Sequence, residues 1–60
     1  MNISEHYDEL AAVRASLADA WARQGNVEEE QRHRAASRFY TRAAAEQRLA
    51  EAGLHQQVAA

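Results

Sequence analysis

Two histidine–carboxylate pairs are the residues of this sequence whose types and spacing come closest to chemistry. Glu30 precedes His33 by three residues, and His6 precedes Glu9 by three, so each pair lies on one side of a helix. Carboxylate and imidazole groups with this spacing bind metals in some helical bundles. Both pairs stand among polar residues, and a helical hairpin places them at opposite ends of the molecule. We therefore expect neither a metal site nor a cofactor.

Groups that would support catalysis are scarcer still. No serine has a histidine and an acid arranged around it in a recognisable pattern, cysteine is absent, and no glycine-rich loop is available to hold a phosphate. Sixty residues folded as two helices leave no room within one copy for a pocket of about 300 Å³. The sequence predicts no catalytic residue, and we expect a protein that is not an enzyme.

Three arginines spaced four residues apart form a candidate nucleic-acid-binding stripe, Arg34, Arg38 and Arg42. Guanidinium groups in such a row can each bind a phosphate. Three observations favour a solvated, salt-bridged surface instead. Glu30 can pair with Arg34 across one helical turn, no aromatic residue interleaves the stripe for base stacking, and the net charge is −2. Nucleic acid is therefore the alternative partner and not the expected one.

The composition indicates a chain that needs a partner. Hydrophobic residues make up 47% of the 60 residues, but fifteen of them are alanine, which leaves few larger apolar groups for the core of a monomer. We expect a second copy or another protein to cover apolar surface that one chain leaves exposed. No apolar stretch approaches the ~20 residues that span a bilayer, and no basic segment precedes an apolar run at the N-terminus. We expect a cytoplasmic protein without a membrane partner.

Gly25-Asn26 separates two long helical patterns. Glycine readily takes the left-handed conformation that ends a helix, and asparagine accepts hydrogen bonds from the free N–H groups that begin one. Asn26 and Glu29 have the spacing of a capping box, as do Asn2 and Glu5. The sequence predicts an all-α fold, an antiparallel two-helix hairpin. Its single domain, 1–60, would contain a helix over 3–24, a turn at 25–26, a helix over 27–52, and a tail over 53–60 that Gly53 begins.

Each predicted helix has an apolar side. In the first helix, large residues form one row and small residues a second row beside it: Ile3, Tyr7, Leu10, Val13, Leu17 and Trp21, then Ala11, Ala15, Ala18 and Ala22. In the second helix, a four-three spacing predicts a packing seam made of Ala36, Tyr40, Ala43, Gln47, Ala50 and Leu54. Phe39 and Leu49 would fill gaps in this seam. Folding about the turn brings three pairs of opposite charges together: Glu9 with Arg42, Asp19 with Arg32, and Arg23 with Glu28.

The centre of the chain resembles a tetratricopeptide repeat. In that family, a Leu-small pair, an aromatic residue four positions after the leucine, and a Gly-Asp/Asn turn join two packed helices. The resemblance covers about a quarter of the chain, and Glu30 stands where the family usually has alanine. It implies protein–protein interaction without defining a ligand. The matching residues are Leu17-Ala18-x-Ala20-Trp21-x-x-Gln24-Gly25-Asn26-Val27-Glu28-Glu29.

These patterns together predict a small non-catalytic protein–protein interaction module, an adaptor or a regulator. It would act as a homodimer in the form of a four-helix bundle, with an unidentified protein as a further partner. The alternative is a dimeric helical hairpin that binds nucleic acid through the arginine stripe. The predicted interface consists of six large residues and one alanine: Tyr7, Leu10, Leu17, Trp21, Phe39, Tyr40 and Ala43.

Overall fold

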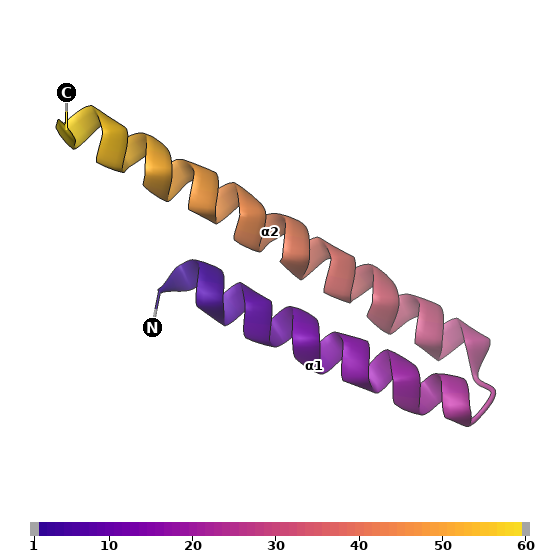
Figure 1. Ribbon diagram of the computed structural model, residues 1–60. Helices are drawn as coiled ribbons and strands as arrows, with labels where there is room; N and C mark the ends of the chain where they lie inside the picture. Colours follow the sequence, from indigo (N-terminus) through magenta and orange to yellow (C-terminus); the bar gives the residue numbers. More distant parts are fainter. Residues whose placement is uncertain (1, 60) are drawn as a thin grey trace.

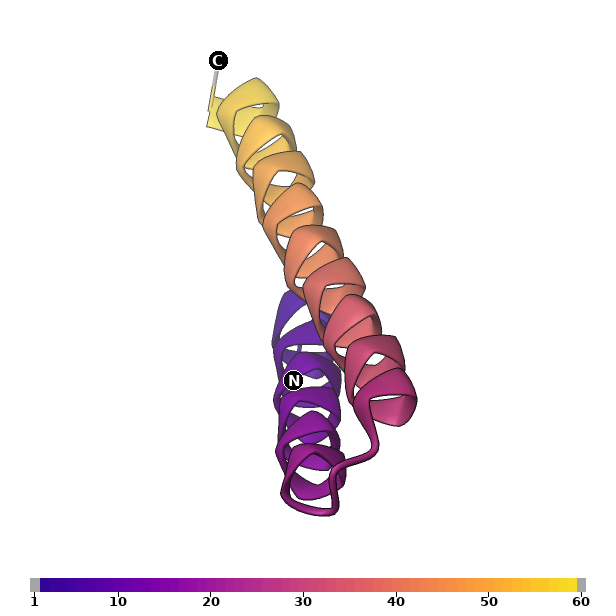
Figure 2. The ribbon, with the colours of Figure 1, turned by 90° about the vertical axis from the view of Figure 1, so that its right-hand side faces the viewer.

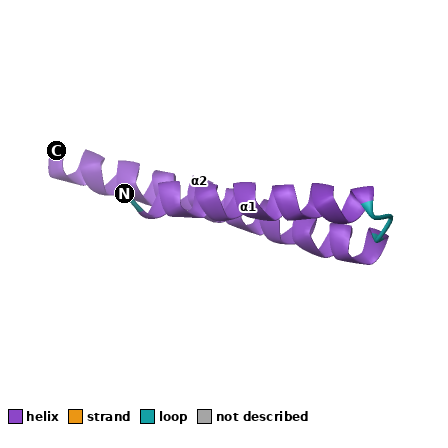
Figure 3. Cartoon of the chain, turned by 90° about the horizontal axis from the view of Figure 1, so that it is seen from below, coloured by secondary structure: helices purple, strands orange, loops and turns teal. Residues whose placement is uncertain are grey.

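Two long helices joined by one tight turn make up the structure (Figure 1). The computed structural model describes residues 2–59, with side-chain surroundings for residues 2–53. Helix α1 spans Ile3–Arg23 and helix α2 spans Val27–Ala59. The helices lie side by side and antiparallel, which confirms the predicted all-α hairpin (Figures 1 and 3).

The turn forms because two adjacent residues satisfy the backbone groups of both helix ends. Gly25 has a φ of 76°, the left-handed conformation, and its N–H donates to the Ala22 carbonyl at 3.0 Å. The N–H of Asn26 donates to the Trp21 carbonyl, also at 3.0 Å, which completes a Schellman motif. The Asn26 side chain then accepts a hydrogen bond from the N–H of Glu29 at 3.0 Å and caps α2. The predicted turn is confirmed.

The start of α1 also follows the sequence pattern. The side-chain oxygen of Asn2 accepts hydrogen bonds from the backbone N–H of Glu5 at 2.9 Å and from the hydroxyl of Ser4 at 2.8 Å. Asn2 therefore satisfies one of the backbone donors that the first turn of a helix leaves free. At its other end α1 stops at Arg23, and Gln24, the predicted last residue, is its C-cap.

Helix α2 is longer than the sequence predicted. It does not end before Gly53 but continues to Ala59, so the predicted tail is helical up to that residue. Glycine inside a helix costs only about 1 kcal/mol relative to alanine, and the flanking residues are mostly good helix formers with no proline among them. With 33 residues against 21 in α1, the C-terminal part of α2 extends past the start of α1 (Figure 1).

Small side chains fill the seam between the two helices. Ser4, Ala11 and Ala18 of α1 are buried, and Ala18 and Ala44 are completely inaccessible to solvent. The three α1 residues are seven apart, a repeat that keeps one row of a helix against its partner. Because these side chains are short, the helices pack closely, and the separation of packed helices depends on the side chains at the contact.

The seam of α2 lies one residue away from the predicted one. Ala44 is buried instead of Ala43, and the Ser37 hydroxyl, rather than Ala36, reaches α1, where it donates to the Ala11 carbonyl at 2.9 Å. Positions 36, 37, 43 and 44 all carry small residues, so the sequence pattern allows either row. Tyr40 and Gln47 are half-buried, whereas Ala50 is exposed. The side chain of Leu54, the last predicted seam residue, lies outside the described residues.

The predicted contributions of Phe39 and Leu49 to this seam are also wrong. Their exposed fractions are 67% and 74%, so neither fills a gap between the helices. Each points away from α1 because it lies on the opposite side of α2 from the buried Ala44. A seam of small residues leaves no gaps between the helices for such large side chains.

Two ion pairs join the antiparallel helices, although they are not the predicted ones. Asp19 pairs with Arg34, at 3.1 Å, and Asp8 pairs with Arg48. Arg32, the predicted partner of Asp19, instead contacts Glu29 on its own helix at 3.0 Å. Among the described residues Glu9 forms no ion pair with Arg42, and Arg23 forms none with Glu28, which instead lies 3.9 Å from Arg32. The predicted antiparallel arrangement of the helices was correct, but their predicted rotation about the helix axes was wrong.

The hairpin is a flat layer one helix thick. Its Cα atoms extend over 53 × 18 × 9 Å. Figure 2 shows that α2 is inclined to α1. A layer of this kind has two broad faces and two outer edges, and no second layer covers either face within the chain.

Candidate interaction surfaces

Ion pairs occupy one broad face of the layer, here called the charged face. It carries both inter-helix pairs, Asp8 with Arg48 and Asp19 with Arg34. Arg34 also donates from Nε to Glu30 at 2.9 Å, so two carboxylates bind one guanidinium. The hydrogen bond to Glu30 and, to a lesser extent, the one to Asp19 raise the pKa of Arg34 above its usual value. The guanidinium therefore stays charged. The charges of this face are satisfied within the chain.

Aromatic residues lie on the opposite face, here called the apolar face. The rings of Tyr7 and Tyr40 stack across the seam with centroids 6.2 Å apart and an interplanar angle of 25°. Phe39 meets Tyr40 edge to face, with centroids 5.5 Å apart and an angle of 75°. Offset-stacked and edge-to-face rings are the favoured aromatic arrangements. The three rings join α1 to α2 and continue to the outer side of α2.

The apolar face continues along α1 towards the turn. Leu10 follows Tyr7 by three residues, and Leu17 and Trp21 follow at intervals of seven and four, so all four lie along one side of the helix. Leu17 is 40% exposed, and Leu10 and Trp21 are half-buried. The structure thus brings six of the seven predicted interface residues onto one face: Tyr7, Leu10, Leu17, Trp21, Tyr40 and Ala43. The seventh, Phe39, lies at the border with the outer edge of α2.

The three arginines of the predicted stripe differ in their surroundings. Arg34 is held by Glu30 and Asp19, whereas among the described residues neither Arg38 nor Arg42 has a carboxylate within ion-pair distance. Arg38 and Arg42 line a shallow hollow of about 280 Å³ together with Ala35 and Phe39. Phe39 therefore lies beside Arg38 and Arg42. The hollow is a feature of the outer edge of α2.

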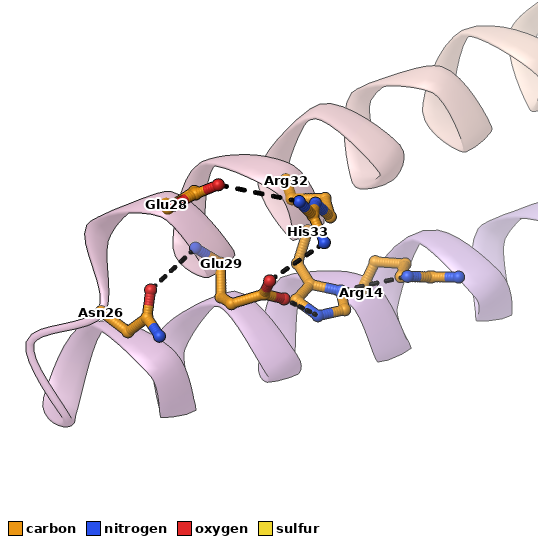
Figure 4. A network of polar contacts seen from close by, with 6 residues as sticks. All are labelled: Arg14, Asn26, Glu28, Glu29, Arg32 and His33. Carbon is orange, nitrogen blue, oxygen red and sulfur yellow. Dashed lines mark hydrogen bonds and ion pairs between the residues drawn. The ribbon is translucent and has the colours of Figure 1, made fainter.

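A polar network ties the helices together near the turn (Figure 4). Nη1 of Arg14 lies 3.1 Å from Nδ1 of His33, and Nε2 of His33 lies 3.8 Å from Glu29. Arginine can only donate hydrogen bonds, so Nδ1 of His33 is the acceptor in this contact. Arg32 pairs with Glu29 and, at 3.9 Å, with Glu28. His33 therefore serves as an inter-helix contact.

The histidine–carboxylate pairs of the sequence are separated in the structure. Glu30 turns to Arg34, and His33 contacts Glu29 instead. His6 is exposed next to Tyr7, with ring centroids 6.5 Å apart. Across the part of the chain with described side chains, no three histidine, cysteine, aspartate or glutamate residues gather into a group that could hold a metal ion. Likewise, neither helix, as far as it is described, has a segment long and apolar enough to cross a membrane.

Sequence reasoning missed Ser4, Arg14 and Ser37 as seam residues. A signal for them exists in the spacing of seven that links Ser4, Ala11 and Ala18 and links Ser37 with Ala44. Arg14 lies midway between Ala11 and Ala18 along this repeat, where a long side chain crosses the seam at its rim. The predicted row of small residues on the first helix contained the buried Ala11 and Ala18, but its other members were Ala15 and Ala22, and it left out Ser4.

Comparison with known protein families, with curated proteins and with solved structures finds no match to this chain. The resemblance to a tetratricopeptide repeat is therefore limited to a two-helix hairpin with a Gly-Asn turn. The fold and the surfaces described above are the basis for any functional conclusion.

Proposed function

We propose that this protein is a small, non-catalytic protein–protein interaction module that works as a homodimer through its apolar face. The observation that carries the proposal is the row of large residues on one face of a layer one helix thick, although Val13 and Leu49 are exposed elsewhere. An apolar face of a helical layer is stable in water when a second layer covers it. Among the described residues no second layer covers this face, and we infer that another molecule covers it.

A second copy fits this face in size. The part of the layer where both helices lie side by side is about 32 Å long, from the 21 residues of α1 at 1.5 Å each. With each helix about 10–12 Å across including side chains, its area approaches the roughly 800 Å² per partner of a standard protein interface. Two hairpins stacked through their apolar faces would form a four-helix bundle with their charged faces outward. In that arrangement Leu17 and Trp21 would be covered, and the satisfied ion pairs of Arg34 and Arg48 would stay in water.

The state of the arginines weighs against the nucleic-acid alternative. Arg34 neutralises two acids of its own chain, which reduces the predicted stripe to Arg38 and Arg42. Two phosphate contacts on a chain of net charge −2 give little electrostatic attraction for a nucleic acid. The large residues, by contrast, form a continuous surface over both helices. Protein binding is the function that the surfaces support best.

Sedimentation velocity with a pair of adjacent glutamate variants tests the proposal. Leu17→Glu places a charge in the apolar face, whereas Ser16→Glu places the same charge at an exposed position outside it. The unmodified protein and the Ser16 variant should sediment as dimers, and the Leu17 variant should be a monomer. Trp21 fluorescence should shift to longer wavelength in the Leu17 variant, because dissociation returns the indole to water.

Two results would overturn the assignment. A wild-type protein that remains a helical monomer at high concentration would leave the apolar face without its partner. Retention of single-stranded RNA that weakens steeply with salt, and is lost in Arg38→Ala/Arg42→Ala, would instead support nucleic-acid binding. Circular dichroism of each variant shows whether a loss of association comes from unfolding.

A further inference from the structure

The two outer edges of the layer carry charges that nothing in the hairpin satisfies. On α1, Glu5 and Glu9 lie one helical turn apart with exposed side chains that reach no basic group among the described residues. On α2, Arg38 and Arg42 also lie one turn apart, exposed and without a carboxylate partner. On the charged face, the described charged side chains have partners of opposite charge. One edge of the hairpin thus offers two acids, and the other offers two arginines with the same spacing.

These charges match in register as well as in spacing. Within the hairpin, Tyr7 of α1 stacks on Tyr40 of α2. Applying this offset to the α1 of a second copy, laid antiparallel along the outer edge of α2, puts Glu9 opposite Arg38 and Glu5 opposite Arg42. Nearer the turn the same register puts Arg23 opposite Gln24 and Glu28 opposite Asp19, so the charge match is confined to the two pairs of Glu9 and Glu5.

Apolar groups complement each other at the same place. The hollow beside Arg38 and Arg42 has Ala35 and Phe39 as its other lining residues, and Phe39 is 67% exposed. In the register given above, the numbers of opposite residues add to 47, so Val13 of the second copy comes opposite Arg34, next to Ala35. Val13 is 56% exposed. Its side chain is of a size to contact Ala35 at the end of the hollow.

We propose that the outer edge of α2 in one copy binds the outer edge of α1 in another, through Arg38 with Glu9, Arg42 with Glu5, and Val13 beside Ala35 at the end of the hollow. This contact goes beyond the face-to-face dimer and uses a different surface. It is heterologous, since two different edges meet, so each added copy leaves one free edge of each kind. The hairpins therefore extend sideways into a row of antiparallel helices.

The strength of this contact depends on salt. Exposed ion pairs contribute at most about fivefold each to an equilibrium constant, and salt screens them. Growth of the row should be strongest at about 0.01 M salt, where the Debye length is about 30 Å, and should be lost at about 1 M, where it is about 3 Å. The apolar face-to-face dimer should persist at both concentrations.

Charge reversal provides the test, with sedimentation velocity at low salt as the measurement. The acidic-edge variant carries Arg38→Glu and Arg42→Glu, and the basic-edge variant carries Glu5→Arg and Glu9→Arg. A third variant with all four changes has the net charge of the wild type and serves as the matched control. We expect the mean mass of the wild type and of the four-change variant to rise with concentration beyond the dimer. Each two-change variant should stop at the dimer, and an equal mixture of the two should grow again.

The outcomes separate this proposal from the proposed function. A wild type whose mass never exceeds the dimer, or an acidic-edge variant that grows as the wild type does, overturns edge binding and leaves the dimer intact. If the smallest species is a monomer but charge reversal still abolishes growth, edge binding stands and the face-to-face dimer fails. Helix content measured by circular dichroism identifies any variant that has unfolded. The four-change variant then shows whether the loss of growth beyond the dimer came from the charges of the edges.

Discussion

Replacing a single buried alanine with leucine distinguishes the observed seam from the predicted one. Ala44 is completely inaccessible, and two turns away along α2 the Ser37 hydroxyl already contacts the α1 backbone at 2.9 Å. An isobutyl group at position 44 has no space in this seam, so the helices must separate or the side chain must leave its preferred rotamer. Overpacking of this kind costs about 1–3 kcal/mol of unfolding free energy. Ala44→Leu should therefore lower stability by that amount.

Neighbouring alanines supply the controls. Ala45 is exposed, and alanine and leucine have nearly equal helix propensities, so Ala45→Leu should change the unfolding free energy by less than about 0.5 kcal/mol. Ala43 is half-buried on the side of the apolar face, and Ala43→Leu should cost less than Ala44→Leu. For a domain of this size, each 1 kcal/mol shifts the melting temperature by about 4–8 °C.

Thermal and urea unfolding followed by circular dichroism measure these differences. Protein concentration must be held constant, because association stabilises the folded state by mass action. Equal melting temperatures for Ala44→Leu and Ala45→Leu would refute the close-packed seam. A larger loss at position 43 than at position 44 would place the seam where the sequence pattern put it.

Two further substitutions test the turn and the charged face. Gly25→Ala forces a residue with a Cβ into a φ of 76°, which costs roughly 1–2 kcal/mol, and a urea midpoint equal to that of the wild type would contradict the Schellman turn. Asp19→Asn removes one of the two carboxylates at Arg34 on an exposed surface, so the expected loss is below about 1 kcal/mol and shrinks as salt is added. A large, salt-independent loss would mean that the pair contributes more than its exposure allows.

The sequence by itself determined the two helices and the turn that joins them. Asn2, Gly25 and Asn26 act on backbone groups within a few residues of themselves, and the hydrogen bonds they form are those that their side chains and conformations favour. Local signals of this kind can be read without knowledge of the rest of the fold. The row of large residues on α1 was equally visible, because helical periodicity alone places them on one side.

Only the tertiary structure decided how the two helices meet. Ala43 and Ala44 are the same residue type at adjacent positions, and nothing local distinguishes them. The choice depends on the rotation of α2 about its axis against α1, which in turn decides that Arg34 meets Asp19 and that His33 meets Arg14. In a helix rich in alanine, a shift by one residue changes little in the apolar pattern, but it turns every charged side chain by about 100°. The partners of the charges therefore follow from the packing of the two helices, and the sequence pattern alone leaves that packing undetermined.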